Sequence, residues 1–157
     1  MNRIPFLIAS AAFVLAVSCG GQESYTTPLI LQSRIVQSDC EEISTAMAPL
    51  PAVTVDVRSG SVVVRHDNIY LPKGSVLGIE DRDGLLSWRD SEAYYYLDAG
   101  TEFITLRESA RIVNNEVFCL YSLTVSIGNI SGGEYTFYLF DHTGAAIPEA
   151  TVELDIR

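Results

Sequence analysis

The stretch Val53–His66, which reads VTVDVRSGSVVVRH, decides the fold of this chain. Valines alternate with polar residues up to Arg58, and a second run of valines follows the dipeptide Ser59-Gly60. Alternation with a period of two is typical of a strand that buries one face. Two such runs around a two-residue turn predict a β-hairpin.

The same pattern continues from Leu29 to the C-terminus, where short runs rich in Val, Ile, Tyr, Phe and Thr are separated by Gly, Asn, Asp and Pro. No helical period is sustained. About nine short strands with turns roughly every ten residues predict an all-β fold, a two-sheet antiparallel β-sandwich of the Ig-like type. The segment Glu41–Pro51 fits either a single helical turn with a loop or a crossover between the sheets.

Beyond the hairpin, the predicted strands are 76–79, 85–89, 93–97, 102–106, 117–127, 135–139 and 152–156. The longest of these, 117–127, places every second residue on one face. Those residues are Cys119, Tyr121, Leu123, Val125 and Ile127.

The N-terminus has the layout of an export signal. Arg3 supplies a positive charge, Phe6–Val17 is apolar, and small residues precede Cys19. This pattern predicts a lipoprotein signal peptide at 1–18, lipidation of Cys19, a flexible tether at 19–27 and a single β-sandwich domain at 28–157. Ordinary signal peptidase stays an alternative, because Leu15 stands four residues before Cys19, one more than is usual in lipoproteins.

The chain has three cysteines, an odd number for an exported protein. If Cys19 carries the lipid, Cys40 and Cys119 are left as a pair, and we predict a disulfide between them. The alternative is two free thiols. The polar surroundings of Cys40, Ser38-Asp39-Cys40-Glu41-Glu42, favour the disulfide, since an unpaired thiol behaves as a small apolar group.

The chain is acidic, with 20 Asp and Glu against 10 Lys and Arg and a formal net charge of -10. This balance argues against nucleic acid as a partner, because nucleic-acid binding depends on basic side chains. Membrane attachment would have to come from the lipid and not from a basic patch. Gly20 after Cys19 is not the Asp of an inner-membrane retention signal, so we expect the outer membrane, on its periplasmic or surface face.

Two segments carry a resemblance to a known group of proteins. One is Cys119–Val125, CLYSLTV, with Gly133, Tyr135 and Thr136 after it; the other is Ser61–Tyr70. Together they resemble small uncharacterised lipoproteins of the Bacteroidota. The resemblance implies a β-sandwich and an envelope location, and it implies no activity. The chain departs from that group at Val117, where a further cysteine is common.

Aromatic residues are the candidates for a binding surface. Trp88 and the run Tyr94-Tyr95-Tyr96 could stack on sugar rings or anchor a protein interface. The alternative is ordinary core packing, because successive residues of a strand point to opposite faces.

Metal and cofactor motifs are weak. An acidic loop containing Asp81, Asp83 and Asp90 has Ile79 at the position where a calcium loop needs its first carboxylate. His66 and His142, the two histidines, stand in no zinc-ligand spacing. We predict no metal and no cofactor.

Catalytic motifs are absent as well. The chain has no Gly-x-Ser-x-Gly element, so we predict no catalytic residues and no enzyme activity. A triad can still assemble in space. A small hydrolase would need a polar pocket that holds His66 or His142 beside a serine or a carboxylate.

The sequence thus predicts a lipid-anchored cell-envelope protein that acts as a non-catalytic binding module for a glycan, a peptide or an envelope protein. The alternative is a structural accessory subunit that docks through its tyrosine-rich strand. A small hydrolase is the least supported of the three hypotheses.

Overall fold

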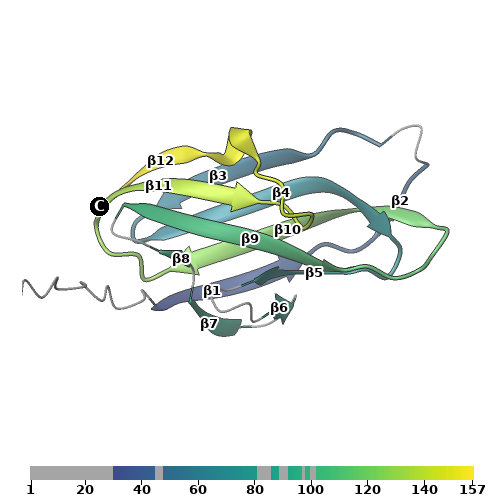
Figure 1. The fold of residues 1–157 in the computed structure, drawn as a ribbon, viewed down its shortest axis with the longest axis horizontal. Coiled ribbons are helices and arrows are strands. Elements are labelled where there is room, and N and C mark those ends of the chain that lie inside the picture. Colours follow the sequence, from purple (N-terminus) through teal and green to yellow (C-terminus); the bar gives the residue numbers. More distant parts are fainter. Residues whose placement is uncertain (1–29, 45–47, 81–85, 89–91, 97, 100–101) are drawn as a thin grey trace, which may run out of the picture.

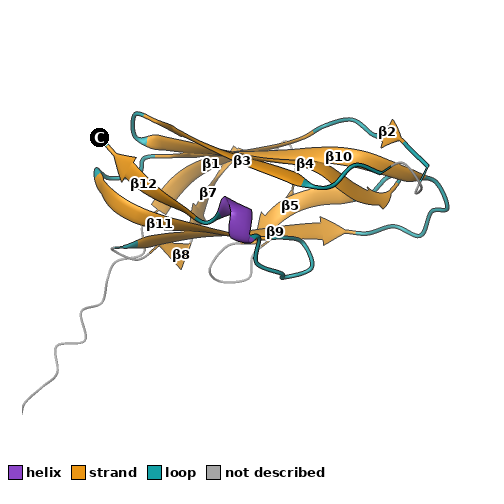
Figure 2. Ribbon diagram, turned by 90° about the horizontal axis from the view of Figure 1, so that it is seen from above, coloured by secondary structure: helices purple, strands orange, loops and turns teal. Residues whose placement is uncertain are grey.

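The computed structural model describes residues 30–44, 48–80, 86–88, 92–96, 98–99 and 102–157. In this part of the chain two six-stranded sheets pack face to face (Figures 1 and 2). The predicted all-β, two-sheet sandwich is confirmed. Residues 1–29, which include the predicted signal peptide, Cys19 and nearly all of the tether, lie outside the described residues.

The first sheet has the order β3-β4-β10-β1-β7, with β2 paired to β10. Its strands are β1 (Ile30–Gln37), β2 (Glu41–Glu42), β3 (Ala52–Arg58), β4 (Ser61–Pro72), β7 (Glu92–Tyr96) and β10 (Phe118–Gly128).

The second sheet has the order β12-β11-β9-β5-β6, with β8 paired to β9. Its strands are β5 (Val76–Glu80), β6 (Leu86–Trp88), β8 (Asp98–Ala99), β9 (Phe103–Arg111), β11 (Gly133–Phe140) and β12 (Val152–Ile156). A short 3-10 helix, η2 (Pro148–Ala150), precedes β12 at one edge of the sandwich (Figure 2).

The predicted hairpin is confirmed as β3 and β4, which pair antiparallel with Arg58 opposite Ser61. Gly60 has a φ of 68°, a left-handed conformation that glycine adopts without steric cost. The segment Glu41–Pro51 begins with the short strand β2, and its residues 45–47 lie outside the described residues. Asp98 and Ala99, which lie between the predicted strands 93–97 and 102–106, form β8 and pair with β9.

One pairing differs from the antiparallel arrangement. Strands β9 and β11 run parallel, with Thr136 opposite Phe103 and Leu139 opposite Leu106. After β9 the chain crosses to the first sheet as β10 and then returns as β11, so no hairpin turn joins the two strands. Side-chain alternation is the same in both directions, and it therefore carries no information on strand direction.

The core lies between the inner faces of the two sheets. The predicted inward face of β10 is confirmed, because all five of its residues are buried, from Cys119 to Ile127. Phe137 and Leu139 of β11 and Leu154 of β12 close the core from the second sheet. Alternation in the sequence therefore identified the buried face of these strands.

A disulfide and a buried amide join elements near one end of the sandwich. Cys40 and Cys119 are bonded, with their Cα atoms 5.2 Å apart, which confirms the predicted pair. Gln37 of β1 reaches the opposite sheet: its Oε1 accepts from the backbone N–H of Leu77 at 2.8 Å, and its Nε2 donates to the carbonyl of Ser75 at 3.1 Å. The amide thereby satisfies backbone groups that would otherwise be buried without partners.

In the described part of the chain, no helix has the length and the apolar character that crossing a membrane would require.

Replacing both Cys40 and Cys119 with alanine should lower the free energy of unfolding by about 4 kcal/mol, because the bond closes a long loop in the unfolded chain. Urea denaturation of the variant and of the wild-type protein with and without reductant measures this. Reduction should destabilise the wild-type protein and leave the variant unchanged. Equal midpoints for oxidised and reduced wild-type protein would contradict the prediction.

A candidate binding cleft with two histidines

A cleft of about 740 Å³ opens at the edge of the sandwich where β3 and η2 lie. Its walls come from three segments: 49–53 at the start of β3, His66–Tyr70 of β4, and 141–149 between β11 and η2. We call it the histidine cleft. Its volume is in the range of small-molecule and peptide side-chain sites, which are mostly apolar with a few polar groups.

The polar residues of the histidine cleft are His66, Asn68, Tyr70, Asp141, His142 and Glu149. The remaining walls are largely apolar and include Leu50, Ile69 and Pro148. In the sequence, both histidines are candidates only for metal ligands or members of a triad, and no motif predicts that they line one cleft. Only the tertiary structure brings them together, since His66 lies on β4 of the first sheet and His142 lies in the turn after β11 of the second sheet.

A β-bulge in β4 builds one wall of the cleft. Leu123 of β10 stands opposite His66 and Tyr121 opposite Ile69, so two residues of β4, Asp67 and Asn68, face one residue of β10. Asn68 has a φ of 62°. The extra residue shifts the alternation, so His66 and Ile69 both point inward although they are three positions apart.

Asn68 also holds the opposite wall in place. Its Nδ2 donates to the carbonyl of Leu50 at 3.0 Å and thereby ties the Pro49–Pro51 segment to β4. Leu50 is 85% exposed and forms an apolar part of the border of the cleft. The bulge thus positions both a buried histidine and the loop that borders it.

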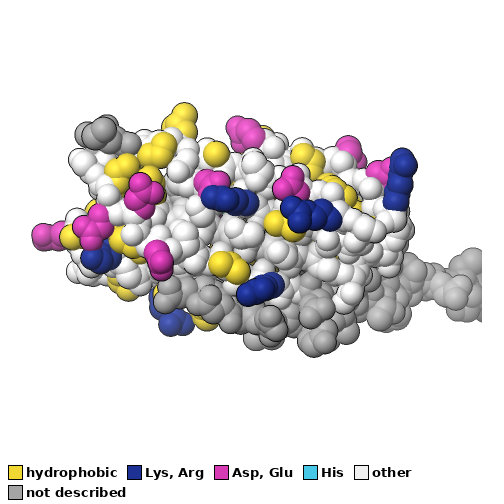
Figure 3. All heavy atoms as spheres, turned by 180° about the vertical axis from the view of Figure 1, so that it is seen from behind, with side chains coloured by type: hydrophobic (Ala, Val, Ile, Leu, Met, Phe, Trp, Pro, Cys, Tyr) yellow, Lys and Arg dark blue, Asp and Glu magenta, His cyan; other side chains and the backbone are white. Residues whose placement is uncertain are grey.

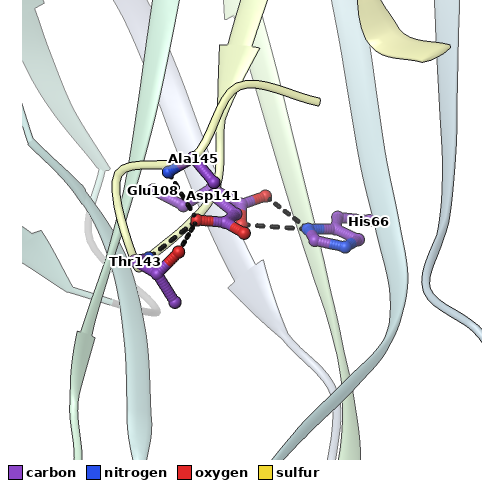
Figure 4. A network of polar contacts seen from close by, with 5 residues as sticks. All are labelled: His66, Glu108, Asp141, Thr143 and Ala145. Atoms are coloured by element: carbon purple, nitrogen blue, oxygen red, sulfur yellow. Dashed lines mark hydrogen bonds and ion pairs between the residues drawn. The ribbon is translucent and has the colours of Figure 1, made fainter. Parts of the chain in front are cut away.

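His66 forms a buried pair with Glu108, which lies on β9 of the opposite sheet. The Nδ1 atom of His66 is 2.9 Å from each carboxylate oxygen of Glu108, and the side chains are 5% and 1% exposed (Figure 4). The pair therefore spans the core between the sheets. Within the described residues, the second ring nitrogen, Nε2, is buried and has no hydrogen-bond partner.

The carboxylate determines which ring nitrogen is free. An ionised Glu108 only accepts hydrogen bonds, so Nδ1 carries a proton and donates it. Nε2, on the other side of the ring, is then an acceptor in the neutral imidazole and a donor in the imidazolium. Carboxylate–histidine pairs of this kind orient imidazoles in metal sites and in general bases.

Asp141 organises the loop on the other side of the cleft. Its Oδ1 accepts from the Thr143 hydroxyl at 2.6 Å, from the Thr143 backbone N–H at 2.8 Å and from the Ala145 backbone N–H at 3.0 Å (Figure 4). Partial burial raises the pKa of this carboxyl, but these hydrogen bonds and the charge of His142 outweigh burial and hold the pKa below its usual value. The neighbouring His142 has a buried Nδ1 atom for which the described residues supply no partner.

The described walls of the cleft contain no serine, threonine or cysteine. Within the described ranges, no three His, Cys, Asp or Glu side chains are grouped so that they could hold a metal ion. The arrangement that a hydrolase would need is present in part: His66 lies beside the Glu108 carboxylate and lines a pocket, but the walls of that pocket are largely apolar.

The predicted aromatic surface is divided between the two sheets. Trp88 lies on β6 of the second sheet, with the Arg111 guanidinium 4.7 Å from its ring centroid. The tyrosine run lies on β7 of the first sheet, where Tyr95 pairs with Leu31. The side chains of Tyr94, Tyr95 and Tyr96 lie outside the described residues. These aromatics therefore do not share one strand.

The absence of a side chain at Gly78 leaves room for the Trp88 ring. A Cβ atom at Gly78 would lie 2.2 Å from the carbonyl oxygen of Ser87 and 2.9 Å from the Trp88 ring, both too close for any side chain.

On the outer face of the first sheet, basic and acidic side chains alternate with scattered apolar groups (Figure 3). Such a mixed surface is typical of a solvated face. The acidic residues of the calcium alternative, Asp81, Asp83 and Asp90, lie outside the described residues.

Comparison with known proteins found no match for this chain among family models, curated proteins or solved structures.

Replacing Glu108 with leucine should lower the free energy of unfolding by about 3 kcal/mol, because it leaves the His66 Nδ1–H buried without a partner. His66→Leu should cost a similar amount. The double variant should cost clearly less than the sum, since two leucines bury no unpaired polar group. Urea denaturation of the four proteins measures the coupling, and additive costs would show that the two residues do not act as a pair.

Asp141→Asn should lower the free energy of unfolding by about 1 kcal/mol at pH 7, because charge-assisted hydrogen bonds are stronger than neutral ones and this site is partly exposed. The folded-state pKa lies below the unfolded-state value, so the ionised carboxylate stabilises the fold above about pH 4 and loses this effect as the pH falls through the folded pKa. The difference between variant and wild type should therefore shrink in acid. Thermal melts from pH 7 to pH 2.5 test this, and a constant difference would contradict it.

Proposed function

We propose that this protein is a lipid-anchored module of the cell envelope that binds a ligand in the histidine cleft and does not transform it. The observation that carries the proposal is the cleft itself, in which two imidazoles, His66 and His142, each have a buried nitrogen with no partner among the described residues. An unsatisfied buried polar atom costs about 1–3 kcal/mol. Protein atoms cover both nitrogens almost completely, so a ligand that recovers this free energy must displace part of the wall that covers them.

The geometry favours binding over covalent chemistry. The cleft has apolar walls with few polar groups, as in recognition sites, and the described walls offer no serine, threonine or cysteine as a nucleophile. The bulge, the Asn68–Leu50 hydrogen bond and the Asp141 loop hold the walls in position without a ligand. Preorganisation of this kind lowers the entropic cost of binding. A glycan, a peptide or a segment of an envelope protein would fit this description.

The envelope location in this proposal rests on the N-terminus and the cysteines. The signal-like residues 1–18, the small residues before Cys19 and the resemblance to Bacteroidota lipoproteins support it. The Cys40–Cys119 disulfide is compatible with an oxidising compartment.

Intact mass spectrometry of protein extracted from membranes tests the anchor. We expect a mass that begins at Cys19 and includes acyl chains, with two further thiols that become alkylatable only after reduction. Cys19→Ala should abolish the acyl mass, and Ser18→Thr, which keeps the cysteine, should retain it. An unacylated wild-type chain would refute the lipid anchor.

A second candidate function is hydrolysis by water that His66 activates, which the Glu108–His66 pair favours because it presents one ring nitrogen as a base. An ester-hydrolysis assay of wild-type protein and His66→Gln separates the two functions. Equal background rates agree with a binding module. A rate that falls at least 100-fold in the variant, while the fold is kept, would establish the hydrolase.

A further inference from the structure

The described walls of the histidine cleft place no lysine or arginine beside its carboxylates. Asp141 and Glu149 both line the cleft, and its described walls include neither lysine nor arginine. Glu149 is exposed at the start of η2 and makes the cleft mouth acidic. The low pKa of Asp141 keeps its carboxylate ionised throughout the neutral range.

The buried pair behind the cleft adds no net positive charge. While Glu108 is ionised, the His66–Glu108 pair is neutral when His66 carries two protons and negative when it carries one. His142 alone can contribute a positive charge. With Asp141 and Glu149 ionised, the net charge around the cleft is therefore negative in every protonation state of the two histidines.

The hydrogen-bonding groups of the cleft are mainly acceptors. The two carboxylates accept only, and Asn68 uses its Nδ2 to hold Leu50, which leaves its Oδ1 as an acceptor. His66 is nine-tenths buried and lines the cleft, with Nδ1 turned to Glu108 and Nε2 on the opposite edge of the ring (Figure 4). In the neutral ring, Nε2 is a further acceptor without a donor.

From these observations we infer that the ligand of the histidine cleft carries a cationic amine or guanidinium on an aliphatic stem, as a lysine or arginine side chain of a peptide does. The inference rests on the proposed binding function. The cation lies beside Asp141 and Glu149, whose carboxylate oxygens accept hydrogen bonds from its N–H groups. The stem packs on Leu50 and Pro148, the apolar residues that border the mouth.

Ligand-detected saturation-transfer NMR on the detergent-solubilised mature protein tests the inference with a matched pair of probes. Nα-acetyl-lysine methylamide carries the cation, and Nα-acetyl-norleucine methylamide has a similar stem without it. Cadaverine represents a free diamine, and a methyl glucoside represents a glycan. We expect the lysine probe to bind at least tenfold more tightly than the norleucine probe, with an advantage that decreases as salt rises. If Nα-acetyl-lysine methylamide binds more tightly than cadaverine, the natural ligand is a peptide. If cadaverine binds more tightly, the natural ligand is a free polyamine.

Variants connect the signal to the cleft. Glu149→Gln should weaken binding of the lysine probe about three- to tenfold, because it removes one carboxylate at the mouth. Glu134→Gln, an exposed carboxylate at the start of β11 and outside the cleft walls, is the matched control and should change nothing. Ala146→Trp, at an exposed wall position, should fill the cleft and abolish binding of every probe.

The outcomes separate this inference from the proposed function. If the norleucine or glucoside probe binds as tightly as the lysine probe, and Ala146→Trp abolishes that binding, the cleft is a binding site and the cationic ligand is wrong. If the lysine probe binds equally well to Ala146→Trp, or does not bind at all, the inference is overturned.

Discussion

The pairing of β4 with β10 is the constraint on which the rest of the structure depends. These two strands form the centre of the first sheet, and their inward residues supply much of the core. The pairing holds one irregularity, the bulge at Asp67 and Asn68. Because a strand alternates its faces with a period of two, a single extra residue reverses which side chains point inward. Without the bulge, either His66 or Ile69 would face solvent.

The bulge has a consequence in the opposite sheet. His66 points across the core and meets Glu108, so a polar pair occupies a place that two apolar side chains could fill. Buried polar pairs of this type add little net stability, because desolvation offsets most of their attraction, and they are costly to break. What the pair does provide is a fixed imidazole orientation at the wall of the cleft. The fold thus holds a polar group where packing alone would favour an apolar one.

Most of the fold could be predicted from alternation and turn residues. The β3–β4 hairpin and the buried faces of β10 and β11 follow from period-two patterns, since hydrophobic burial requires them. The Cys40–Cys119 bond followed from counting cysteines. The histidine cleft could not be predicted in this way, because its walls come from segments far apart in the chain. One signal was present: His66-Asp67-Asn68 interrupts an apolar run, as a bulge in a strand often does.

By itself, the sequence determined the all-β class, the position of most strands and the disulfide, because these depend on local alternation, turn chemistry and the number of cysteines. Only the tertiary structure decided the parallel pairing of β9 with β11, the partnership of His66 with Glu108 and the cleft between β4 and the loop before η2. The physical reason is that strand direction and contacts across the sandwich depend on how the two sheets pack, and a one-dimensional pattern of apolar and polar residues is the same for many such arrangements.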